Sequence, residues 1–262
     1  MPPTLVFLHG FPDHKGTWFK QLSYFQDQCQ TVALDLPGFN TSPASIHFSD
    51  YEIGYVADQL LVQITQLSTT EIVLVGHDWG GILASVMAEK QPHLITKLIL
   101  INSTHPTFFA HHLAHSWKQK LKSYYAYLFQ MPWLPEIFLY MTTRLFFRVL
   151  LTTHHREKNP DFYQSYLVAY SRLANWRAAL NYYRNFFRHL RVWRVPIPIS
   201  QQTPTLVIWG THDSFLDDRL VELMRQHWYG PTEFKVIENG GHWVHLRQAE
   251  TVNQTISEFL TQ

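Results

Sequence analysis

The chain has 262 residues, of which 46% are hydrophobic and 16% charged, and its formal net charge is +1. This length and composition predict a globular protein with one large α/β domain, and nothing in the charge favours a nucleic-acid partner. The single cysteine, Cys29, excludes an internal disulfide framework, and the start of the chain has neither a charged region nor a long apolar run. We therefore expect a cytoplasmic protein.

Short apolar runs alternate with helical patterns along most of the chain. The runs predict strands at residues 4–9, 31–35, 72–76, 98–102, 205–209 and 234–237. Apolar residues at helical spacing predict helices at residues 51–67, 82–90, 216–228 and 252–260. This alternation indicates a mostly parallel central sheet flanked by helices, so functional side chains are expected where the strands end.

The third run ends in a sequence that predicts a sharp turn carrying an acidic side chain. Gly76, Gly80 and Gly81 surround Asp78, which gives the G-x-Nu-x-G pattern of a nucleophile elbow with aspartate in place of serine. A carboxylate is ionised at pH 7 and can displace at a saturated carbon directly, so Asp78 favours an alkyl substrate. The alternative is that Asp78 only caps the helix after it.

Between residues 102 and 205 the strand signal stops, and prolines at 132, 135 and 160 divide the sequence into helical pieces. We expect a helical cap at residues 105–200, inserted into a core made of residues 1–104 and 201–262. The cap segment has thirteen basic and three acidic residues, a charge of +10, whereas the remainder has eight and seventeen, a charge of −9. The opposite signs suggest a basic cap that faces an acidic core.

Residues 131–151 of this segment interleave large apolar side chains with Arg144 and Arg148. Peripheral contact with an anionic membrane surface is one interpretation, but we favour interior packing around a lipophilic substrate tunnel. Five of the cap histidines, which lack a consistent metal-ligand spacing, are expected to be solvated: His111, His112, His115, His154 and His155.

The last two strands of the series are followed by GTHD at residues 210–213 and GGHW at residues 240–243. With Asp78, these place nucleophile, acid and histidine in the order of the α/β-hydrolase triad. Seven motifs in one order then resemble the epoxide hydrolase family of the α/β-hydrolase superfamily, in particular its single-domain, epoxide hydrolase 4-like members: HGFPD, DLPGF, GHDWGG, SYYAYLFQMPWLPE, LNYYRN, PTLVIWGTHD and GGHW. The resemblance extends over nearly the whole chain and implies the α/β-hydrolase fold.

The resemblance implies that a small lipophilic epoxide is opened to a vicinal diol, without a metal or cofactor. It assigns Asp78 as nucleophile, Asp213 and His242 as the charge-relay pair, and Tyr125 and Tyr183 as the cap hydroxyls that meet the epoxide oxygen. Asp78 would form an ester with the substrate, and His242 would activate the water that breaks it. Basic and aromatic cap residues suggest an apolar, anionic substrate such as an epoxy fatty acid.

An oxyanion forms when the ester is hydrolysed and needs hydrogen-bond donors. The backbone N–H groups of Phe11 and Trp79 are the candidates. In the manner of the family, the Phe11–Pro12 peptide bond is expected to be cis. His9 is expected to line the substrate site together with Phe11, Trp79 and the two cap tyrosines.

Other interpretations of these residues stay open. A haloalkane or haloacid dehalogenase shares the aspartate nucleophile, but it needs halide donors where this chain has Phe11, and it has no use for paired tyrosines. A catalytically idle hydrolase fold used for binding is a further alternative, against which the intact triad argues. Within the motifs, His245 competes with His242, and Asp217 and Asp218, which more simply begin and solvate the next helix, compete with Asp213.

Family members ordinarily begin with two further strands before the His-Gly-Phe-Pro loop, and this chain starts almost on that loop. We expect these two N-terminal strands to be missing, so that residues 31–35 form an exposed sheet edge. A partner chain such as a second copy in a homodimer, or an altered edge, would then cover it, unless the start codon is misassigned.

Overall fold

A sheet of six parallel strands forms the centre of the computed structural model, which describes residues 3–67, 71–155, 159–194 and 199–262. The strands are β1 (Thr4–Leu8), β2 (Gln30–Leu34), β3 (Ile72–His77), β4 (Ile95–Ile101), β6 (Thr205–Gly210) and β8 (Thr232–Ile237). Their order is β2-β1-β3-β4-β6-β8, with β1 paired to both β2 and β3. The chain therefore reverses its direction of winding at β1, and the loops after β1 and β3 separate there, which is where ligands bind in open parallel sheets.

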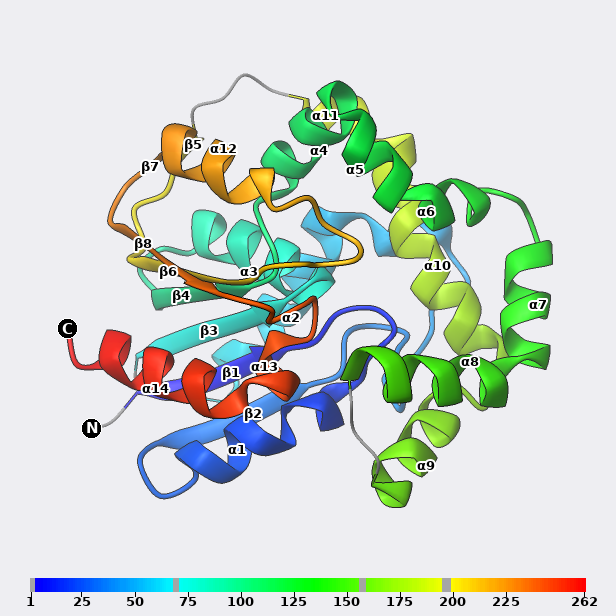
Figure 1. Cartoon of the computed structure of the whole chain (residues 1–262), viewed down its shortest axis with the longest axis horizontal. Coiled ribbons are helices and arrows are strands. Elements are labelled where there is room, and N and C mark those ends of the chain that lie inside the picture. The colour runs from blue at the N-terminus through cyan, green and yellow to red at the C-terminus, as the bar shows by residue number, and fades with distance from the viewer. Residues whose placement is uncertain (1–2, 68–70, 156–158, 195–198) are drawn as a thin grey trace.

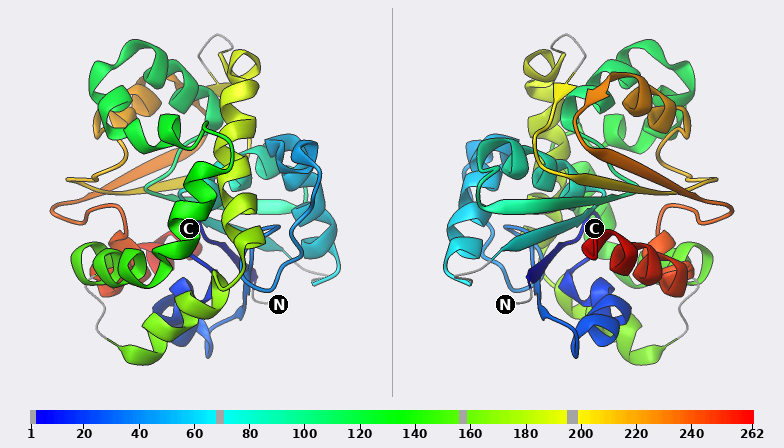
Figure 2. Two further views of the ribbon diagram at one scale, coloured as in Figure 1. Left: turned by 90° about the vertical axis from the view of Figure 1, so that its right-hand side faces the viewer. Right: turned by 90° about the vertical axis from the view of Figure 1, so that its left-hand side faces the viewer.

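Helices cover both faces of this sheet (Figures 1 and 2). Leu5 and Phe7 of β1 pack on the face covered by α1 (Phe19–Phe25) and α14 (Ala249–Leu260). Val6 and Leu8 pack on the opposite face with α2 (Ile53–Thr65) and α3 (Trp79–Lys90). All four side chains are fully buried, which explains why this strand is a continuous apolar run rather than an alternating one.

The six expected strands are confirmed, with end shifts of up to three residues. The largest shift is in β4, which begins at Ile95 because its first residues pair with β3 through an irregular register. Sequence patterns missed two short helices, α1 and α13 (Val244–Arg247), and a two-stranded sheet of β5 (Ile199–Ser200) and β7 (Trp228–Tyr229). β2 lies at one edge of the large sheet with its residues partly exposed, as expected.

Between β4 and β6 the described chain is helical apart from β5. The helices are α4 (Pro106–His115), α5 (Trp117–Lys122), α6 (Tyr124–Leu128), α7 (Leu134–Met141), α8 (Thr143–Leu150), α9 (Pro160–Ala169), α10 (Leu173–Arg188) and α11 (Leu190–Trp193), with a π-helical turn at Leu151–His155. Pro135 and Pro160 lie in the first turns of α7 and α9, where the missing N–H is tolerated, so they begin helices as well as separating them. α6, α7, α8 and α10 stand beyond the carboxyl ends of the strands (Figure 1).

Two expectations about residues between the cap and the core need correction. Asp217, expected to begin and solvate the next helix, does precede α12 (Arg219–His227) but is fully buried and forms ion pairs with Lys118 and Arg219. His155, expected in solvent, is buried against the ring of Trp243. Both residues lie in the packing contact between the cap helices and the core. A local sequence pattern cannot reveal such a tertiary contact.

The expected interior packing of the apolar residues at 131–151 is wrong for more than half of them. Leu139, Phe147 and Leu150 are buried, but the following side chains are exposed: Met131, Trp133, Leu134, Ile137, Phe138, Tyr140, Met141, Leu145 and Val149. No helix within the described residues is long and apolar enough to cross a membrane.

Candidate active site

Asp78 occupies a strained turn between β3 and α3. Its backbone has a φ of 51° and a ψ of −122°, a region that non-glycine residues rarely adopt. A side chain on Gly80 would meet the carbonyl oxygen of Leu8, and one on Gly76 would meet the backbone of Gly80, so glycine is required for strand, turn and helix to approach closely. The turn lifts the Asp78 side chain away from the strand and toward the carboxyl edge of the sheet.

The Asp78 side chain does not cap α3. No capping hydrogen bond joins its carboxylate to the helix interior, and Oδ1 instead accepts the backbone N–H of Phe11 at 2.8 Å. The backbone N–H of Trp79 also bonds to this carboxylate. The Phe11–Pro12 bond is cis, as expected. Both N–H groups expected to stabilise an oxyanion thus already point at the Asp78 carboxyl group.

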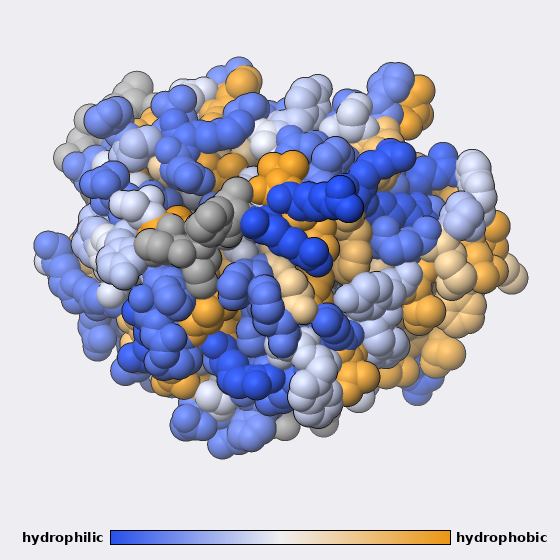
Figure 3. All heavy atoms as spheres, turned by 90° about the horizontal axis from the view of Figure 1, so that it is seen from above, coloured by the Kyte–Doolittle hydropathy of each residue, from blue (hydrophilic) through white to orange (hydrophobic). Residues whose placement is uncertain are grey.

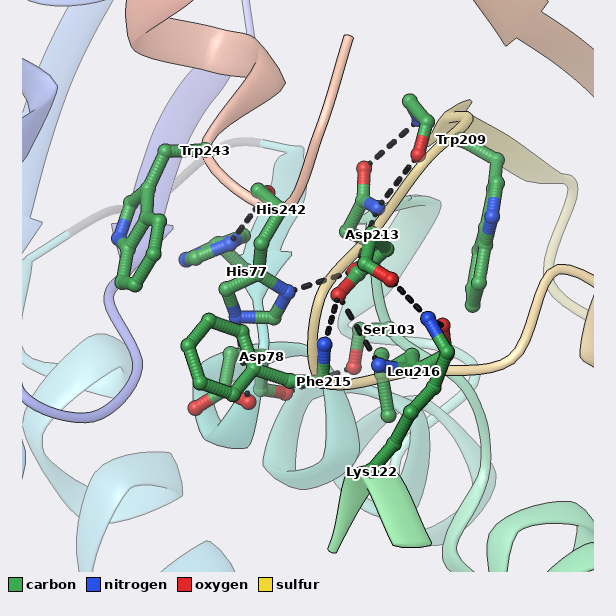
Figure 4. Close-up of polar contacts among 12 residues, drawn as sticks. His77, Asp78, Ser103, Lys122, Trp209, Asp213, Phe215, Leu216, His242 and Trp243 are labelled. Carbon is green, nitrogen blue, oxygen red and sulfur yellow. Dashed lines mark hydrogen bonds and ion pairs between the residues drawn. The ribbon is translucent and has the colours of Figure 1, made fainter. Parts of the chain in front are cut away.

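His242 lies between two carboxylates (Figure 4). Its Nδ1 is 2.7 Å from Asp213 Oδ2, and its Nε2 is 3.6 Å from Asp78 Oδ2. Asp213 Oδ1 accepts the backbone N–H groups of Phe215 and Leu216 at 2.7 and 2.9 Å. The hydrogen bond to Asp213 holds Nδ1 as the protonated nitrogen, which leaves Nε2 free to take a proton beside Asp78.

Burial and neighbouring charges act in opposite directions on the pKa values of Asp78, Asp213 and His242. Burial raises the pKa of Asp78, although His242 and the N–H groups of Phe11 and Trp79 act to lower it. For Asp213, burial also acts to raise the pKa, but His242 and the hydrogen bonds lower it more, so the carboxylate stays ionised. Burial acts to lower the pKa of His242, but Asp213 and then Asp78 raise it above the ordinary value. Asp213 therefore favours an imidazolium that forms when His242 takes a proton.

The expected cap hydroxyls belong to different helices but meet above Asp78. Tyr125 of α6 and Tyr183 of α10 have ring centroids 5.8 Å apart, and their hydroxyls are hydrogen-bonded to each other. Burial and the Asp78 charge raise the pKa of Tyr125, and burial raises that of Tyr183, so both hydroxyls remain protonated and able to donate. Their neighbours differ: Tyr182 donates to the carbonyl of Pro37, and Tyr124 is exposed.

Two cavities meet at Asp78 and these tyrosines. The larger has a volume of about 160 Å³ and extends from Asp78 past His242. The other, about 30 Å³, extends along α3 and α10. Aromatic side chains dominate the larger cavity: Phe11, Tyr124, Tyr125, Phe129, Phe146, Tyr183, Phe215 and Trp243. Among the described residues, no lysine or arginine lines either cavity, so the basic charge of the cap lies outside them.

His9, expected to line the substrate site, does not line either cavity. It is fully buried beneath the site, where its Nδ1 lies 2.8 Å from the carbonyl of Gly10 and its Nε2 accepts the N–H of Leu36 at 3.0 Å. His9 therefore connects the loop after β1 to the loop after β2, a role that its position as the first residue of the HGFPD motif did not distinguish from substrate contact.

His245, the rival of His242, lies behind the site. Its Nε2 is 3.2 Å from the Thr17 hydroxyl, and its ring packs on Trp18 and His77. It is therefore not the histidine that faces Asp78.

Sequence patterns missed the residues that hold the catalytic side chains in place. Asn102, directly after β4, donates to Asp213 Oδ2 at 2.8 Å, and Ser103 donates to the backbone carbonyl of Asp78 at 2.7 Å. Lys122 of α5 donates to the backbone carbonyl of Asp213. Asn102 and Ser103 could have been found from the sequence because they directly follow a strand. Lys122 reaches the site only because the cap packs on the core, which no local pattern indicates.

One group could by its geometry hold a metal ion. Ligand atoms of Asp13, His77 and His245 lie within 4.8 Å of one another. The Asp13 oxygens, however, accept hydrogen bonds from Tyr166 and Trp243 at 2.6 and 2.8 Å. His77 Nε2 lies 3.0 Å from the carbonyl of His242, a contact that supports the loop carrying the histidine. These contacts fit a hydrogen-bonded support for the His242 loop.

The chain is similar in sequence and in fold to proteins that are already known. Residues 3–249 match the family described as alpha/beta hydrolase fold. Epoxide hydrolase 3 of Xenopus tropicalis is 33% identical over 99% of this chain and 72% of its own length. Epoxide hydrolase 4 of Homo sapiens is 30% identical over 99% and 73%. The structure of a Bacillus megaterium epoxide hydrolase with an inhibitor superposes with a TM-score of 0.86 at 26% identity, over 100% of this chain and 94% of that one.

Proposed function

The chain belongs to the epoxide hydrolase family of α/β-hydrolases, and we propose that it opens lipophilic epoxides to vicinal diols through an ester on Asp78. The observation that carries this proposal is the placement of one carboxylate between a histidine base and two tyrosine hydroxyls. Asp78 has His242 Nε2 at 3.6 Å, and Tyr125 and Tyr183 line the same cavities. An ionised carboxylate facing protonated hydroxyls suits a substrate that is attacked at carbon while its oxygen leaves.

In the first step, Asp78 attacks a ring carbon of the epoxide. Oδ1 accepts the Phe11 N–H, whereas Oδ2 lies 3.6 Å from His242 Nε2, and we assign Oδ2 as the oxygen that makes the new C–O bond. The ring C–O bond breaks, and the epoxide oxygen takes a proton from the pair formed by Tyr125 and Tyr183. The products of this step are a hydroxyalkyl ester on Asp78 and a tyrosinate.

In the second step, water hydrolyses the ester. His242 Nε2 removes a proton from the water, whose oxygen attacks the carboxyl carbon of Asp78, and the imidazolium is stabilised by Asp213. The N–H groups of Phe11 and Trp79 stabilise the resulting oxyanion, an effect of about 3–4 kcal/mol per donor. The acyl C–O bond then breaks, and the departing alkoxide takes the proton from His242 and leaves as the diol with the Asp78 oxygen. The second proton of the water passes from the new Asp78 carboxyl group to the tyrosinate, which restores the carboxylate and the tyrosine hydroxyl.

The apolar cavities indicate the substrate class. No charged side chain other than Asp78 and His242 lines them within the described residues, so an anionic group of the substrate would have no cationic partner there. We therefore propose aryl and alkyl epoxides rather than the epoxy fatty acid suggested by the basic cap. We also propose that residues 105–200 act as the cap that excludes water from a core made of residues 1–104 and 201–262.

An oxygen-18 experiment tests this function directly. Enzyme in excess over an aryl epoxide is mixed in H₂¹⁸O, and the products of the first turnover are analysed by mass spectrometry. We expect unlabelled diol and one ¹⁸O in the peptide that contains Asp78, because the diol takes its oxygen from the carboxylate. Label in the first-turnover diol would contradict the ester mechanism. Halide release from haloalkanes without diol from any epoxide would support the dehalogenase alternative.

Removing one cap hydroxyl should slow ester formation more than ester hydrolysis. We expect Tyr125→Phe and Tyr183→Phe each to reduce the rate of alkylation by about tenfold to a hundredfold, since proton donation by a positioned side chain typically contributes ~10²–10⁴-fold. Rapid-quench measurement of the ester on Asp78 separates the two steps. Tyr127→Phe, a change on the exposed side of α6, is the matched control and should leave both rates unchanged. Equal rates in all three variants would remove the tyrosines from the mechanism.

A further inference from the structure

α7 presents its apolar side to solvent and its acidic residue to the interior. Glu136 is 4% exposed and pairs with Arg184 of α10 at 2.5 Å, while Leu139 on the same inner side is buried. The outer side carries apolar residues at helical spacing, among them Phe138 and Met141 at 63% and 79% exposure. This is the reverse of an ordinary surface helix, whose polar side faces water.

The exposed side of α7 continues at both of its ends. We call this surface the α7 face, and it consists of Trp133, Leu134, Ile137, Phe138, Met141 and Leu145. Figure 3, seen from above, shows hydrophobic side chains gathered at the right-hand end of the molecule, where α7 lies in Figure 1. An apolar surface of this kind, bordered by charged residues, is typical of a binding site for a membrane or a protein.

The charges around the α7 face favour an anionic partner. From residue 117 to residue 150 the only acidic residue in the sequence is Glu136, which is buried. Arg144 and Arg148 of α8 are exposed beside the face, and the Arg177 guanidinium lies 5.1 Å from the ring of Trp133. Exposed arginines next to exposed aromatic and aliphatic side chains match the negative headgroups and acyl chains of an anionic bilayer.

The substrate cavity opens near this surface. Tyr124, at the start of α6, is 64% exposed and also lines the 160 Å³ cavity that contains Asp78 and His242. Phe146 and Leu150 of α8 line the same cavity, and α8 also carries Leu145 of the α7 face. A lipophilic molecule leaving a bilayer at the α7 face would therefore meet the cavity wall without a long path through water.

We propose that the α7 face docks the protein on an anionic lipid bilayer and that lipophilic substrate enters the cavity from that bilayer. The apolar side chains enter the headgroup region, and Arg144 and Arg148 bind the anionic headgroups. Docking itself follows from the surface alone, whereas delivery of substrate rests on the proposed epoxide hydrolysis.

Vesicle co-sedimentation tests the docking. The full chain is incubated with vesicles of phosphatidylcholine alone or mixed with phosphatidylserine, and the bound fraction is measured at low and high salt. We expect binding to the anionic vesicles that weakens with salt and falls by more than about tenfold in Phe138→Asp/Met141→Asp and in Arg144→Glu/Arg148→Glu. Val62→Asp, an equally exposed apolar position on α2, is the matched control and should bind as the unaltered chain does.

Folding and delivery are checked separately. Neither pair of altered residues lines the cavities, so turnover of a water-soluble epoxide should be unchanged in both double variants. Turnover of an epoxide dissolved in the vesicles should fall with the bound fraction. The proposal is overturned if the anionic vesicles do not bind, if binding is equal in all variants, or if the face instead holds a second copy, seen as a dimer in sedimentation that the Phe138→Asp/Met141→Asp change dissolves. Loss of vesicle binding with no epoxide turnover in any protein would contradict the proposed function but not the docking.

Discussion

Replacing His242 with glutamine is expected to stop turnover after the first step and to leave a covalent ester on Asp78. Glutamine has a size similar to that of histidine but cannot take a proton from water near neutral pH. Attack by Asp78 on the epoxide does not use His242, so the ester should still form. We expect steady-state turnover to fall by roughly 10⁴-fold, the scale seen when a triad histidine or its partner is lost.

Intact mass spectrometry measures this directly. After incubation of His242→Gln with a panel of aryl and alkyl epoxides, the protein mass should rise by the mass of one whole epoxide. Peptide mapping should place the adduct on Asp78, and the same adduct should be absent in Asp78→Ala. A rise equal to a haloalkane without its halide, from a parallel haloalkane panel, would identify a dehalogenase instead.

His245→Gln is the matched control, because it removes a neighbouring histidine that does not face Asp78. His245 lies in α13, three residues after His242, but faces Thr17 and Trp18 rather than Asp78. This variant should hydrolyse its ester and accumulate no adduct, provided that its near-ultraviolet circular dichroism matches that of the unaltered chain. An adduct on the His245 variant and none on the His242 variant would contradict the assignment of the base.

Much of this site could be predicted because its signals are local. The G-x-D-x-G turn places Asp78 at a strand end by backbone sterics alone, and the strand order brings the ends carrying Asp213 and His242 to the same edge. The choice of Tyr125 and Tyr183 over their neighbours came from motif resemblance, and the structure turns both rings toward Asp78. In each case, a short segment determines where the side chain points.

The incorrect predictions concern the packing of one segment on another. The α7 pattern shows that one side of the helix is apolar, but only the ion pair of buried Glu136 with half-buried Arg184 determines that the other side faces inward. His9 and His155 were misplaced for the same reason, since a histidine next to a loop or in a polar run carries no local sign of burial. The burial of these histidines makes the stability of the fold depend on pH, which no motif indicates.

Lowering the pH from 7.5 to 5.5 is expected to destabilise the fold by several kcal/mol. Five of the buried histidines have a pKa that burial lowers from 6.5, to about 4 for His9 and His14, to about 3 for His245, and well below 6.5 for His77 and His155. The unfolded chain therefore binds more protons than the folded one once the pH falls below about 6.5. Stability is fully present above that pH and is lost as the pH falls toward the folded pKa values.

The hydrogen bonds of these rings explain why the neutral form is favoured. His9 Nε2 accepts the Leu36 N–H, and His14 Nδ1 accepts the Gly16 N–H, so protonation of either nitrogen breaks a hydrogen bond. One pH unit below 6.5, each buried histidine contributes a loss of about 1 kcal/mol, or roughly 5 kcal/mol for five. Asp13 and His242 act in the opposite sense, because burial raises the pKa of Asp13 from 3.8 to about 7 and Asp213 raises the pKa of His242; Asp13 alone offsets about 2 kcal/mol of the loss. The net loss is then a few kcal/mol, a large part of the stability of a typical domain.

Urea unfolding at pH 7.5, 6.5 and 5.5, followed by tryptophan fluorescence, measures this loss. His155→Phe provides a matched comparison, because neither ring nitrogen of His155 has a hydrogen-bond partner among the described residues and the ring packs on Trp243. Phenylalanine keeps that packing without a group to protonate, so the variant should be as stable as the unaltered chain at pH 7.5 and lose about 1 kcal/mol less on acidification. If the free energy of unfolding stayed constant or increased as the pH fell from 7.5 to 5.5, these histidines would not be buried as neutral rings. Rings that resist protonation in the folded state make that state less stable as the pH falls.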